Sequence, residues 1–180
     1  MRKEIVISGF GGQGIMFAGR LLAESALRDG KYVTLFPSYG AEMRGGTANC
    51  RVIISDDVIG SPAVYEPDFL LALNKPSFVK FSKIVKQKGI IFFNSNFLSH
   101  EKEQDNDIIL VHANKLAEQC GSVLAANSVM LGAFVKKTNI VKHESILESI
   151  SEVLSERKKH LVDINREAFI LGLKTNFTEL

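Results

Sequence analysis

The sequence contains little cysteine, and this scarcity excludes several kinds of metal chemistry. Cys50 and Cys120 are the two cysteines in 180 residues. An iron–sulfur cluster is held by about four thiolates, and a structural zinc ion by about four ligands. The cysteines show no C-x-x-C spacing and the four histidines no HxxxH spacing. We therefore expect neither an iron–sulfur cluster nor a zinc site in this chain.

An excess of charge of one sign is also lacking. The chain has 22 Lys+Arg against 20 Asp+Glu, a net charge of +2, which gives no reason to expect a nucleic acid or an anionic membrane as partner. The longest uncharged run, residues 119–135, includes Gln119, Ser122 and Asn127 and is too polar to cross a bilayer. Residues 1–8 lack the apolar segment of a signal peptide. We expect a cytoplasmic protein, in which a disulfide is disfavoured.

The sequence does contain a series of short apolar runs separated by helical patterns. Its length and its 46% of hydrophobic residues fit one domain, residues 1–180. Several runs are apolar without alternation, which is typical of strands covered on both faces. Pro37 should end the second strand, and the turn at Asp56–Asp57 should lead into a short strand that makes part of the sheet antiparallel. The predicted strands are Glu4–Ser8, Tyr32–Phe36, Ala48–Ser55, Val58–Ile59, Phe69–Leu73, Ile90–Phe93 and Ile108–His112.

Helical spacing of apolar residues, together with capping residues, predicts the helices. Pro76 suits the first turn of one helix, Asn127–Ser128 should cap a buried helix, and Asp163 should cap the last one. The alternation of strands and helices predicts an α/β fold, a Rossmann-like three-layer sandwich with a mostly parallel sheet and an antiparallel hairpin. Apart from the helix that begins near Pro76, the predicted helices cover residues 15–29, 114–121, 128–137, 144–159 and 164–173.

The glycine-rich segment GFGGQG, residues 9–14, lies between the first strand and the first helix. Gly9, Gly11 and Gly14 fit the pattern G-x-G-x-x-G, and the segment follows a predicted strand and precedes a predicted helix, as in nucleotide-binding loops. Glycines allow a sharp turn and let a phosphate group approach the backbone amides, while the start of a helix carries a partial positive charge of about +0.5. The alternative is that the glycines serve only helix packing or a protein interface.

Two common nucleotide sites fit this segment poorly. A dinucleotide site has an acidic residue about 20 residues later, at the end of the second strand. The corresponding residues 33–38 (VTLFPS) contain no carboxylate, which argues against an ordinary NAD site. A P-loop would continue with Lys-Ser/Thr, whereas Arg20–Leu21 stands there. ATP hydrolysis is therefore not expected.

A second polar loop, residues 37–47 (PSYGAEMRGGT), follows the second strand. In a parallel sheet both loops open at the same edge, where ligands of open α/β sheets bind. Arg44 with Gly45–Gly46 would place a permanent cation beside exposed backbone donors, and Tyr39 an aromatic face. We expect these residues to contact an anion or a neighbouring subunit. The alternative is a local pair of Arg44 with Glu42.

These motifs together resemble those of a known family. They are GFGGQG at 9–14, SYGAEMRGGTANC at 38–50, Pro67–Asp68 before the fourth strand, and Asn127 with Gly132. In this order, over nearly the whole chain, they resemble the gamma subunit of 2-oxoacid:ferredoxin oxidoreductases. The segment from Arg44 to Thr47 is most similar to the 2-oxoglutarate and branched-chain 2-oxoacid types rather than the pyruvate type. The small subunit of the indolepyruvate enzyme is a related possibility.

The resemblance implies a subunit of an enzyme that oxidatively decarboxylates a 2-oxoacid, with 2-oxoglutarate favoured, and releases an acyl-CoA. Such an enzyme uses thiamine diphosphate and Mg²⁺, and passes electrons through iron–sulfur clusters to ferredoxin. This chain has too few cysteines for a cluster and no GDG sequence to begin a thiamine diphosphate motif. These groups are therefore expected on alpha, beta and delta-type partner subunits. The chain itself would hold no cofactor, cover part of the active site and help to bind coenzyme A.

The predicted site is a set of binding residues at the two loops, with no catalytic residue and no metal ligand. Two other hypotheses remain open: a self-contained nucleotide- or flavin-binding Rossmann-like protein, and a structural subunit whose loops serve only assembly. The residues expected to line the site are Gly9, Gly11, Gly12, Gln13, Gly14, Ser38, Tyr39, Arg44, Gly45 and Gly46.

Overall fold

A computed structural model describes residues 1–38, 47–94, 106–176 and 178–179. The described residues form a seven-stranded sheet of order β2-β3-β1-β4-β5-β6-β7. Five strands share one direction, whereas β3 and β7 run opposite to their neighbours. The mostly parallel sheet predicted from the sequence is thus confirmed. The strands are β1 (Arg2–Phe10), β2 (Tyr32–Ser38), β3 (Thr47–Ser55), β4 (Phe69–Ala72), β5 (Ile90–Asn94), β6 (Asp107–Val111) and β7 (Thr178–Glu179).

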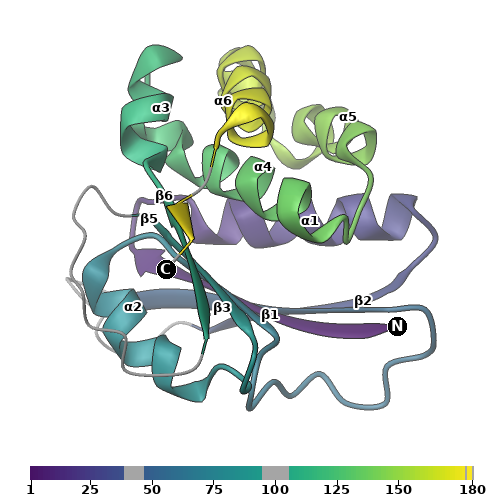
Figure 1. Ribbon diagram of the computed structural model, residues 1–180. Coiled ribbons are helices and arrows are strands. Elements are labelled where there is room, and N and C mark those ends of the chain that lie inside the picture. Colours follow the sequence, from purple (N-terminus) through teal and green to yellow (C-terminus); the bar gives the residue numbers. More distant parts are fainter. Residues whose placement is uncertain (39–46, 95–105, 177, 180) are drawn as a thin grey trace.

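Helices cover both faces of this sheet. Figure 1 shows α1, α3, α4, α5 and α6 on one face and α2 on the other, which gives the predicted three layers. No helix among the described residues is long and apolar enough to span a membrane. The helices are α1 (Ile15–Arg28), α2 (Lys75–Phe81), α3 (Ala113–Gln119), α4 (Ala126–Thr138), α5 (His143–Val153) and α6 (Val162–Lys174), with 3₁₀ turns η1 (Ser82–Ile84), η2 (Val123–Ala125) and η3 (Glu156–Leu161).

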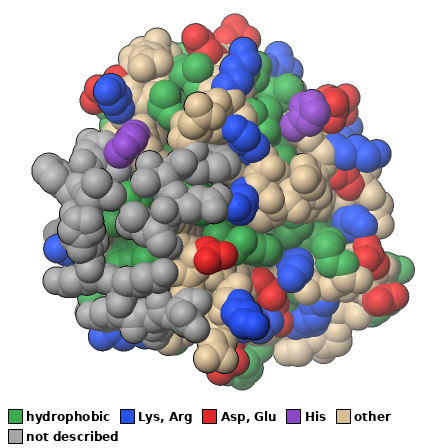
Figure 2. All heavy atoms as spheres, viewed as in Figure 1, with side chains coloured by type: hydrophobic (Ala, Val, Ile, Leu, Met, Phe, Trp, Pro, Cys, Tyr) green, Lys and Arg blue, Asp and Glu red, His purple; other side chains and the backbone are tan. Residues whose placement is uncertain are grey.

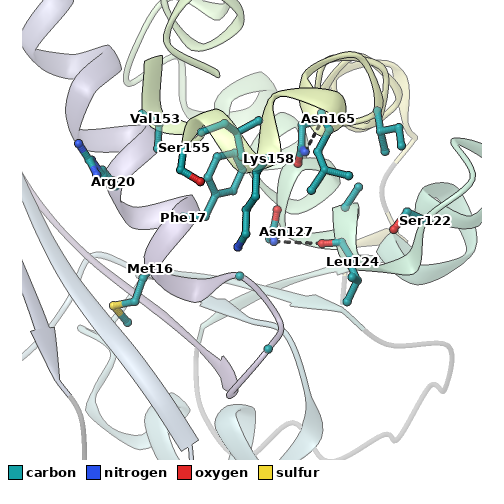
Figure 3. A pocket seen from close by; sticks show the side chains of 16 residues that line it. Met16, Phe17, Arg20, Ser122, Leu124, Asn127, Val153, Ser155, Lys158 and Asn165 are labelled. Atoms are coloured by element: carbon teal, nitrogen blue, oxygen red, sulfur yellow. Dashed lines mark hydrogen bonds between the residues drawn. The ribbon is translucent and has the colours of Figure 1, made fainter. Parts of the chain in front are cut away.

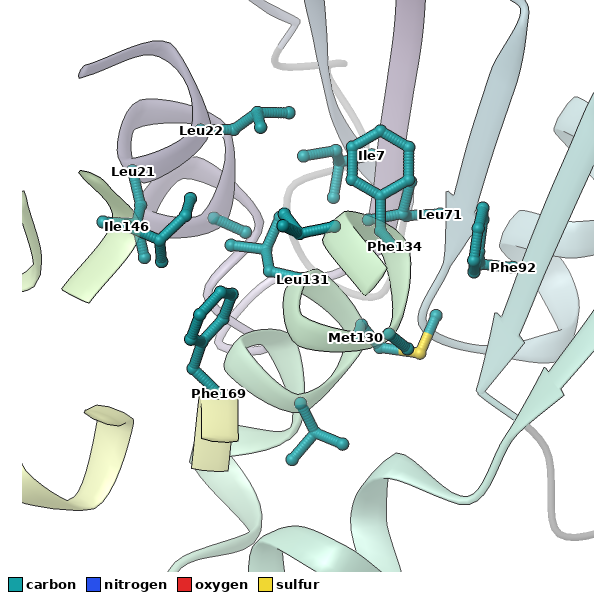
Figure 4. Close-up of a cluster of buried hydrophobic side chains, with 14 of the residues drawn as sticks. Ile7, Leu21, Leu22, Leu71, Phe92, Met130, Leu131, Phe134, Ile146 and Phe169 are labelled. Atoms are coloured by element: carbon teal, nitrogen blue, oxygen red, sulfur yellow. The ribbon is translucent and has the colours of Figure 1, made fainter. Parts of the chain in front are cut away.

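The hydrophobic core has two parts, one on each face of the sheet. Neighbouring residues of β1 point to opposite faces, so that Ile5 and Ile7 pack under the large helical layer and Val6 packs on the side of α2. In the larger part, the ring of Phe92 meets that of Phe134 edge-on, with ring centroids 5.4 Å apart (Figure 4). The ring of Phe69 meets Phe134 edge-on at the same centroid distance. Strands buried on both faces explain the continuous apolar runs in the sequence.

Helices α4 and α6 cross with their backbones in contact, because each contributes a glycine. A Cβ atom on Gly132 would lie 2.2 Å from the carbonyl oxygen of Phe169, and one on Gly172 would lie 2.2 Å from that of Val129. Neither neighbour is a flexible side chain. This close crossing fixes α6 and the adjoining η3 over the amino-terminal end of α4.

The antiparallel part of the sheet is not where the sequence placed it. Residues 58–59 form no strand, and Val58 is 78% exposed with nothing to bury it. Instead β3 lies between β1 and β2 and pairs antiparallel with both. Pro37 does not end β2, which continues to Ser38, because an edge strand has one side without a neighbouring strand and tolerates a proline.

Three predicted helix features also need correction. The helix predicted over residues 144–159 ends at Val153, where Leu154 becomes extended and buries its side chain before η3 begins. Asp163 does not cap α6 but lies within its first turn, since that helix begins at Val162. Asn127 and Ser128 likewise lie inside α4, whose N-cap position is occupied by Ala125 without a side-chain bond.

Candidate functional site at the glycine-rich edge

The two loops singled out in the sequence open at one edge of the sheet. In β1 and β3, Phe10 pairs with Thr47, and in β2 and β3, Ser38 pairs with Asn49. The same edge of the sheet therefore holds the ends of β1 and β2 and the start of β3. Of the second loop's predicted site residues, Ser38 is described, whereas Tyr39, Arg44, Gly45 and Gly46 lie outside the described residues.

The glycines of the first loop meet different constraints. A Cβ atom on Gly9 would lie 2.6 Å from the end of the Ile15 side chain and 2.7 Å from Oε1 of Gln13, so a larger residue there would displace both side chains. Gly14 has φ +73°, and a Cβ atom there would lie 1.9 Å from Nδ2 of Asn127. Gly12 has φ +93°, yet open space surrounds its added Cβ position, as it does that of Gly11. Gly11 and Gly12 thus leave their backbone accessible.

Gln13 fixes the shape of this loop with its side-chain amide. Its Oε1 atom accepts hydrogen bonds from the backbone amide of Phe10 at 2.7 Å and from Nδ2 of Asn74 at 2.8 Å. Its Nε2 atom donates to the carbonyl oxygen of Leu73 at 3.4 Å. Since Asn74 also caps α2, Gln13 ties the end of β1 to the end of β4. Gln13 therefore positions the loop.

Asn94 plays a similar part at the end of β5. Its Oδ1 atom accepts from the backbone amide of Ala113 at 3.1 Å, at the start of α3, and its Nδ2 atom donates to Leu73 at 3.3 Å. Amide side chains thus organise the carboxyl ends of three neighbouring parallel strands. In open α/β sheets this is the edge where ligands bind.

A pocket of about 350 Å³ lies beside the glycine loop, on the helical face (Figure 3). Its walls come from the start of α1, from η2 and the start of α4, and from η3 and α6. It is largely apolar, with Arg20 and Lys158 as its charged side chains and with no acidic residue. The lining residues are Gly12, Gly14, Met16, Phe17, Arg20, Ser122, Leu124, Ala125, Asn127, Val153, Leu154, Ser155, Lys158, Leu161, Ile164 and Asn165.

Asn127 links the glycine loop to the helical wall of this pocket. Its Nδ2 atom donates to the carbonyl oxygens of Gln13 at 3.0 Å and Leu124 at 3.2 Å. The hydroxyl of Ser128 lies 3.2 Å from Oδ1 of Asn127 and 2.7 Å from Oδ1 of Asn165. Asn165 in turn donates to Leu161, which ends η3, at 2.8 Å. A buried polar chain therefore runs from the glycine loop to η3.

Two pocket residues, Asn127 and Lys158, were interpreted differently from the sequence. Asn127 was predicted to cap α4, and its inclusion among the family motifs was the signal that pointed to a larger role. Lys158 lies in a run of basic residues, 157–160, and is not among the site residues predicted from the sequence. Figure 3 shows its side chain extending from η3 into the pocket toward the glycine loop. No signal in the sequence indicated this, because residues 14 and 158 are distant along the chain.

The described residues offer no reactive group at this edge. Among them, no three His, Cys, Asp or Glu side chains gather as metal ligands. Cys50 and Cys120 are free and buried, and burial raises the pKa of both thiols, that of Cys50 to about 12. Positive and negative side chains are interspersed over the face in Figure 2 rather than gathered by sign. The described arrangement is therefore suited to binding and enclosing a ligand.

The fold and this edge define a Rossmann-like α/β protein with a glycine-rich loop between its first strand and its first helix. The family described as "Pyruvate ferredoxin/flavodoxin oxidoreductase" matches residues 4–175. The chain belongs to this family.

Two curated relatives are similar to this chain over most of its residues. The chain is 37% identical over 170 residues to the ketoisovalerate oxidoreductase subunit VorA of Methanothermobacter marburgensis, covering 94% of this chain and 35% of VorA. It thus spans about a third of the length of that relative. It is 38% identical over 165 residues to the 2-oxoglutarate synthase subunit KorC of Methanocaldococcus jannaschii, covering 87% of this chain and 88% of KorC. The resemblance inferred from the motifs is confirmed.

Solved structures agree with the fold. The gamma subunit of a keto/oxoacid ferredoxin oxidoreductase from Geobacter sulfurreducens superposes with a TM-score of 0.82 at 33% identity, covering 96% of both chains. The 2-oxoglutarate:ferredoxin oxidoreductase of Magnetococcus marinus, solved with 2-oxoglutarate, coenzyme A and succinyl-CoA, gives a TM-score of 0.84 at 23% identity. That match covers 96% of this chain and 30% of the other.

Proposed function

We propose that the chain is the gamma subunit of a 2-oxoacid:ferredoxin oxidoreductase that produces an acyl-CoA. The observation that carries this proposal is the family match over residues 4–175, together with the 38% identity to KorC. Thiamine diphosphate, Mg²⁺ and the iron–sulfur clusters would belong to alpha, beta and delta-type partner subunits, with ferredoxin as electron acceptor. Two cysteines in the whole sequence are too few for a cluster.

The favoured substrate is 2-oxoglutarate. KorC, a 2-oxoglutarate synthase subunit, is 38% identical to this chain over 165 residues, and the Arg44–Thr47 segment resembles the 2-oxoglutarate type. Ketoisovalerate is the second candidate, because the identity to VorA is almost the same. The choice of 2-oxoacid is expected to depend on the partner subunits that carry thiamine diphosphate.

This chain would contribute binding and enclosure at the glycine-rich edge. Gly11 and Gly12 leave their backbone open. Gly14 is the N-cap of α1, where no side chain caps the helix, and the first turn of α1 has no acidic residue. Such a helix start favours an anionic group, and coenzyme A carries phosphates. Arg44, Gly45 and Gly46 would extend this contact from the second loop. Covering the active site would keep water from reactive intermediates and hold the reacting groups in place.

Co-purification tests the assembly. The tagged chain, expressed in its native host, should retain larger subunits with a visible iron–sulfur absorption. The complex should reduce a dye acceptor with 2-oxoglutarate only when coenzyme A is present, while the isolated chain should be inactive. A bound chromophore and catalytic activity in the isolated chain would instead support a self-contained flavin or nucleotide enzyme. Retention of no partner would contradict the proposal.

A further inference from the structure

We infer that β2 pairs antiparallel with β2 of a second copy of this chain, with Thr34 at the two-fold axis, so that two sheets join into one. Self-association of this kind is separate from the proposed function, which concerns the partner subunits. The backbone groups, the side chains and the charges of this edge strand all fit the pairing.

The first observation is that β2 (Tyr32–Ser38) is a long, uncharged edge strand. It lies at one end of the strand order, and among the described residues no strand pairs with its outer side. The strand at the opposite end, β7, has two residues, one of which is Glu179. Natural sheets protect their edges with short strands and charged side chains, and β2 has neither, since its seven residues carry no charge. Its outer side is therefore suited to pairing with another strand.

The hydrogen bonds of the sheet identify the groups on the outer side of β2. The carbonyl oxygen of Ser8 in β1 accepts a hydrogen bond from Leu73, directly after β4. Because successive residues direct their N–H and C=O groups to opposite sides of a strand, the even-numbered residues of β1 face β4 and its odd-numbered residues face β3. The registers of β1 with β3 and of β3 with β2 then turn Val33, Leu35 and Pro37 outward. Pro37 lacks an N–H group, so Val33 and Leu35 supply the outward donors.

These outward groups fit a second copy of the same strand in one register. When Thr34 lies opposite Thr34 of the second copy, Val33 lies opposite Leu35, and each such pair exchanges both of its N–H···O bonds. Pro37 then lies opposite Lys31, beyond the paired residues, so its missing N–H group costs no bond within the pair. A register centred on Leu35 would instead set the carbonyl oxygen of Val33 opposite Pro37, which cannot donate.

The second observation is that the same register covers exposed apolar side chains on both faces of the sheet. Tyr32 and Phe36 are 49% and 54% exposed on the face of α2, and Leu35 is 37% exposed on the face of the large helical layer. With Thr34 at the axis, Tyr32 lies beside Phe36 of the second copy, and Val33 lies beside Leu35. Aromatic and β-branched side chains paired across neighbouring strands stabilise an antiparallel ladder.

The third observation is that no like charges oppose each other along the paired strands. Residues 32–38 are uncharged, and the ammonium group of Lys31, which precedes them, pairs with Asp56. A strand that matches its own reverse in backbone groups, side chains and charge favours a second copy over an unrelated strand. The paired residues form a contact smaller than the standard interface of about 800 Å² per partner, so we expect a dissociation constant on the order of 10 μM.

Cysteine cross-linking of the full chain tests the register. Thr34→Cys places a thiol opposite its own copy, where the Cα atoms of a non-hydrogen-bonded pair lie about 4.5 Å apart, within the reach of a disulfide. The Thr34 hydroxyl has no hydrogen-bond partner in the part of the chain that the structure describes, so the substitution removes none. Mild oxidation at about 50 μM chain, well above the expected dissociation constant, should link most of this variant.

Tyr32→Cys is the matched control. Tyr32 lies on the same strand and the same face as Thr34, but in this register the two copies of residue 32 are separated by roughly 14 Å along the strands, too far for a disulfide. The native Cys50 and Cys120 are free and buried, so they contribute little background. Equal linking of Tyr32→Cys and Thr34→Cys would overturn the inference.

Sedimentation equilibrium measures the association itself. The unaltered chain should show a monomer–dimer equilibrium, which Phe36→Ala should weaken about tenfold. Val79→Ala is the control, because Val79 is 49% exposed on α2, away from the strand, and its loss should leave the equilibrium unchanged. A chain that stays monomeric at about 100 μM would overturn the inference.

The same cysteine distinguishes a second copy from a partner strand. A link from Thr34→Cys to a larger subunit in the co-purified complex, in place of a link between two copies, would overturn the inference and assign this edge to the partner. Failure of the co-purification would leave the cross-linking and sedimentation of the chain unaltered, so the two proposals fail separately.

Discussion

Individual glycines in the loop have distinct tasks, and substitution should separate them. Gly14→Ala places a side chain at φ +73° and against Asn127, so it should lower the free energy of unfolding by about 3 kcal/mol. Gly11→Ala meets open space without a positive φ and should cost less than about 1 kcal/mol. Urea unfolding followed by circular dichroism measures both. Equal losses would show that Gly14 is not conformationally required.

A second prediction at the residue scale concerns the reactivity of the Cys50 thiol. Cys50 is fully buried, and burial raises the pKa of its thiol to about 12, although a hydrogen bond partly opposes this. The thiolate is the reactive form, so the folded protein should react with a disulfide reagent at pH 8 only as fast as it unfolds. Urea-denatured protein, the control, should react at once at both cysteines. Rapid labelling of Cys50 in the folded protein, located by peptide mass spectrometry, would contradict this.

At the scale of helices and strands, the crossing of α4 and α6 leaves no room for an added Cβ atom at its two glycines. Gly132→Ala would press a methyl group against the backbone of Phe169 and Gly172, which cannot give way as a side chain would. We expect a loss of about 3 kcal/mol in the free energy of unfolding. Gly60→Ala is the control, since its added methyl group meets nothing within 4 Å. A Gly132→Ala protein as stable as the control would show that the two helices can separate at little cost.

The elements themselves were largely predictable, whereas their pairing was not. Apolar runs located β1, β4, β5 and β6 because their residues are buried on both faces. An apolar run shows neither the direction of its strand nor which strands lie beside it. The position of β3 between β1 and β2 could therefore not be predicted from these runs. The break after Val153 was missed because the apolar stripe continues through Leu154, which is buried in an extended rather than a helical conformation.

At the scale of the whole molecule, the sequence predicted the side of the candidate site that the two loops form. It placed both loops at one edge because strands that share a direction end together, and the pairs Phe10–Thr47 and Ser38–Asn49 agree with this. It could not predict the other wall of the pocket. That wall depends on the crossing of α4 and α6, which carries η3 and Lys158 over a loop more than a hundred residues earlier.

The last prediction concerns how the chain associates with its proposed partner subunits, through an apolar rim beside the glycine loop. Phe10, Val123 and Leu124 are 37%, 46% and 70% exposed, and they adjoin the open backbone of Gly11 and Gly12 through Gln13 and Asn127. If the proposed partner subunits cover this edge, Val123→Lys would bury an unpaired charge there. We expect the yield of co-purified partner to fall tenfold or more while the melting temperature of the isolated chain stays unchanged.

Val58→Lys is the matched control for that experiment. Val58 is 78% exposed and follows the far end of β3, where Ser55 pairs with Arg2, so it lies at the opposite edge of the sheet. The same substitution there should leave the yield of partner as in the unaltered chain. Equal retention by both variants would place the contact with the partner away from the glycine-rich edge. Loss in Val58→Lys alone would move it to the other edge, because a charge weakens association only where binding removes it from water.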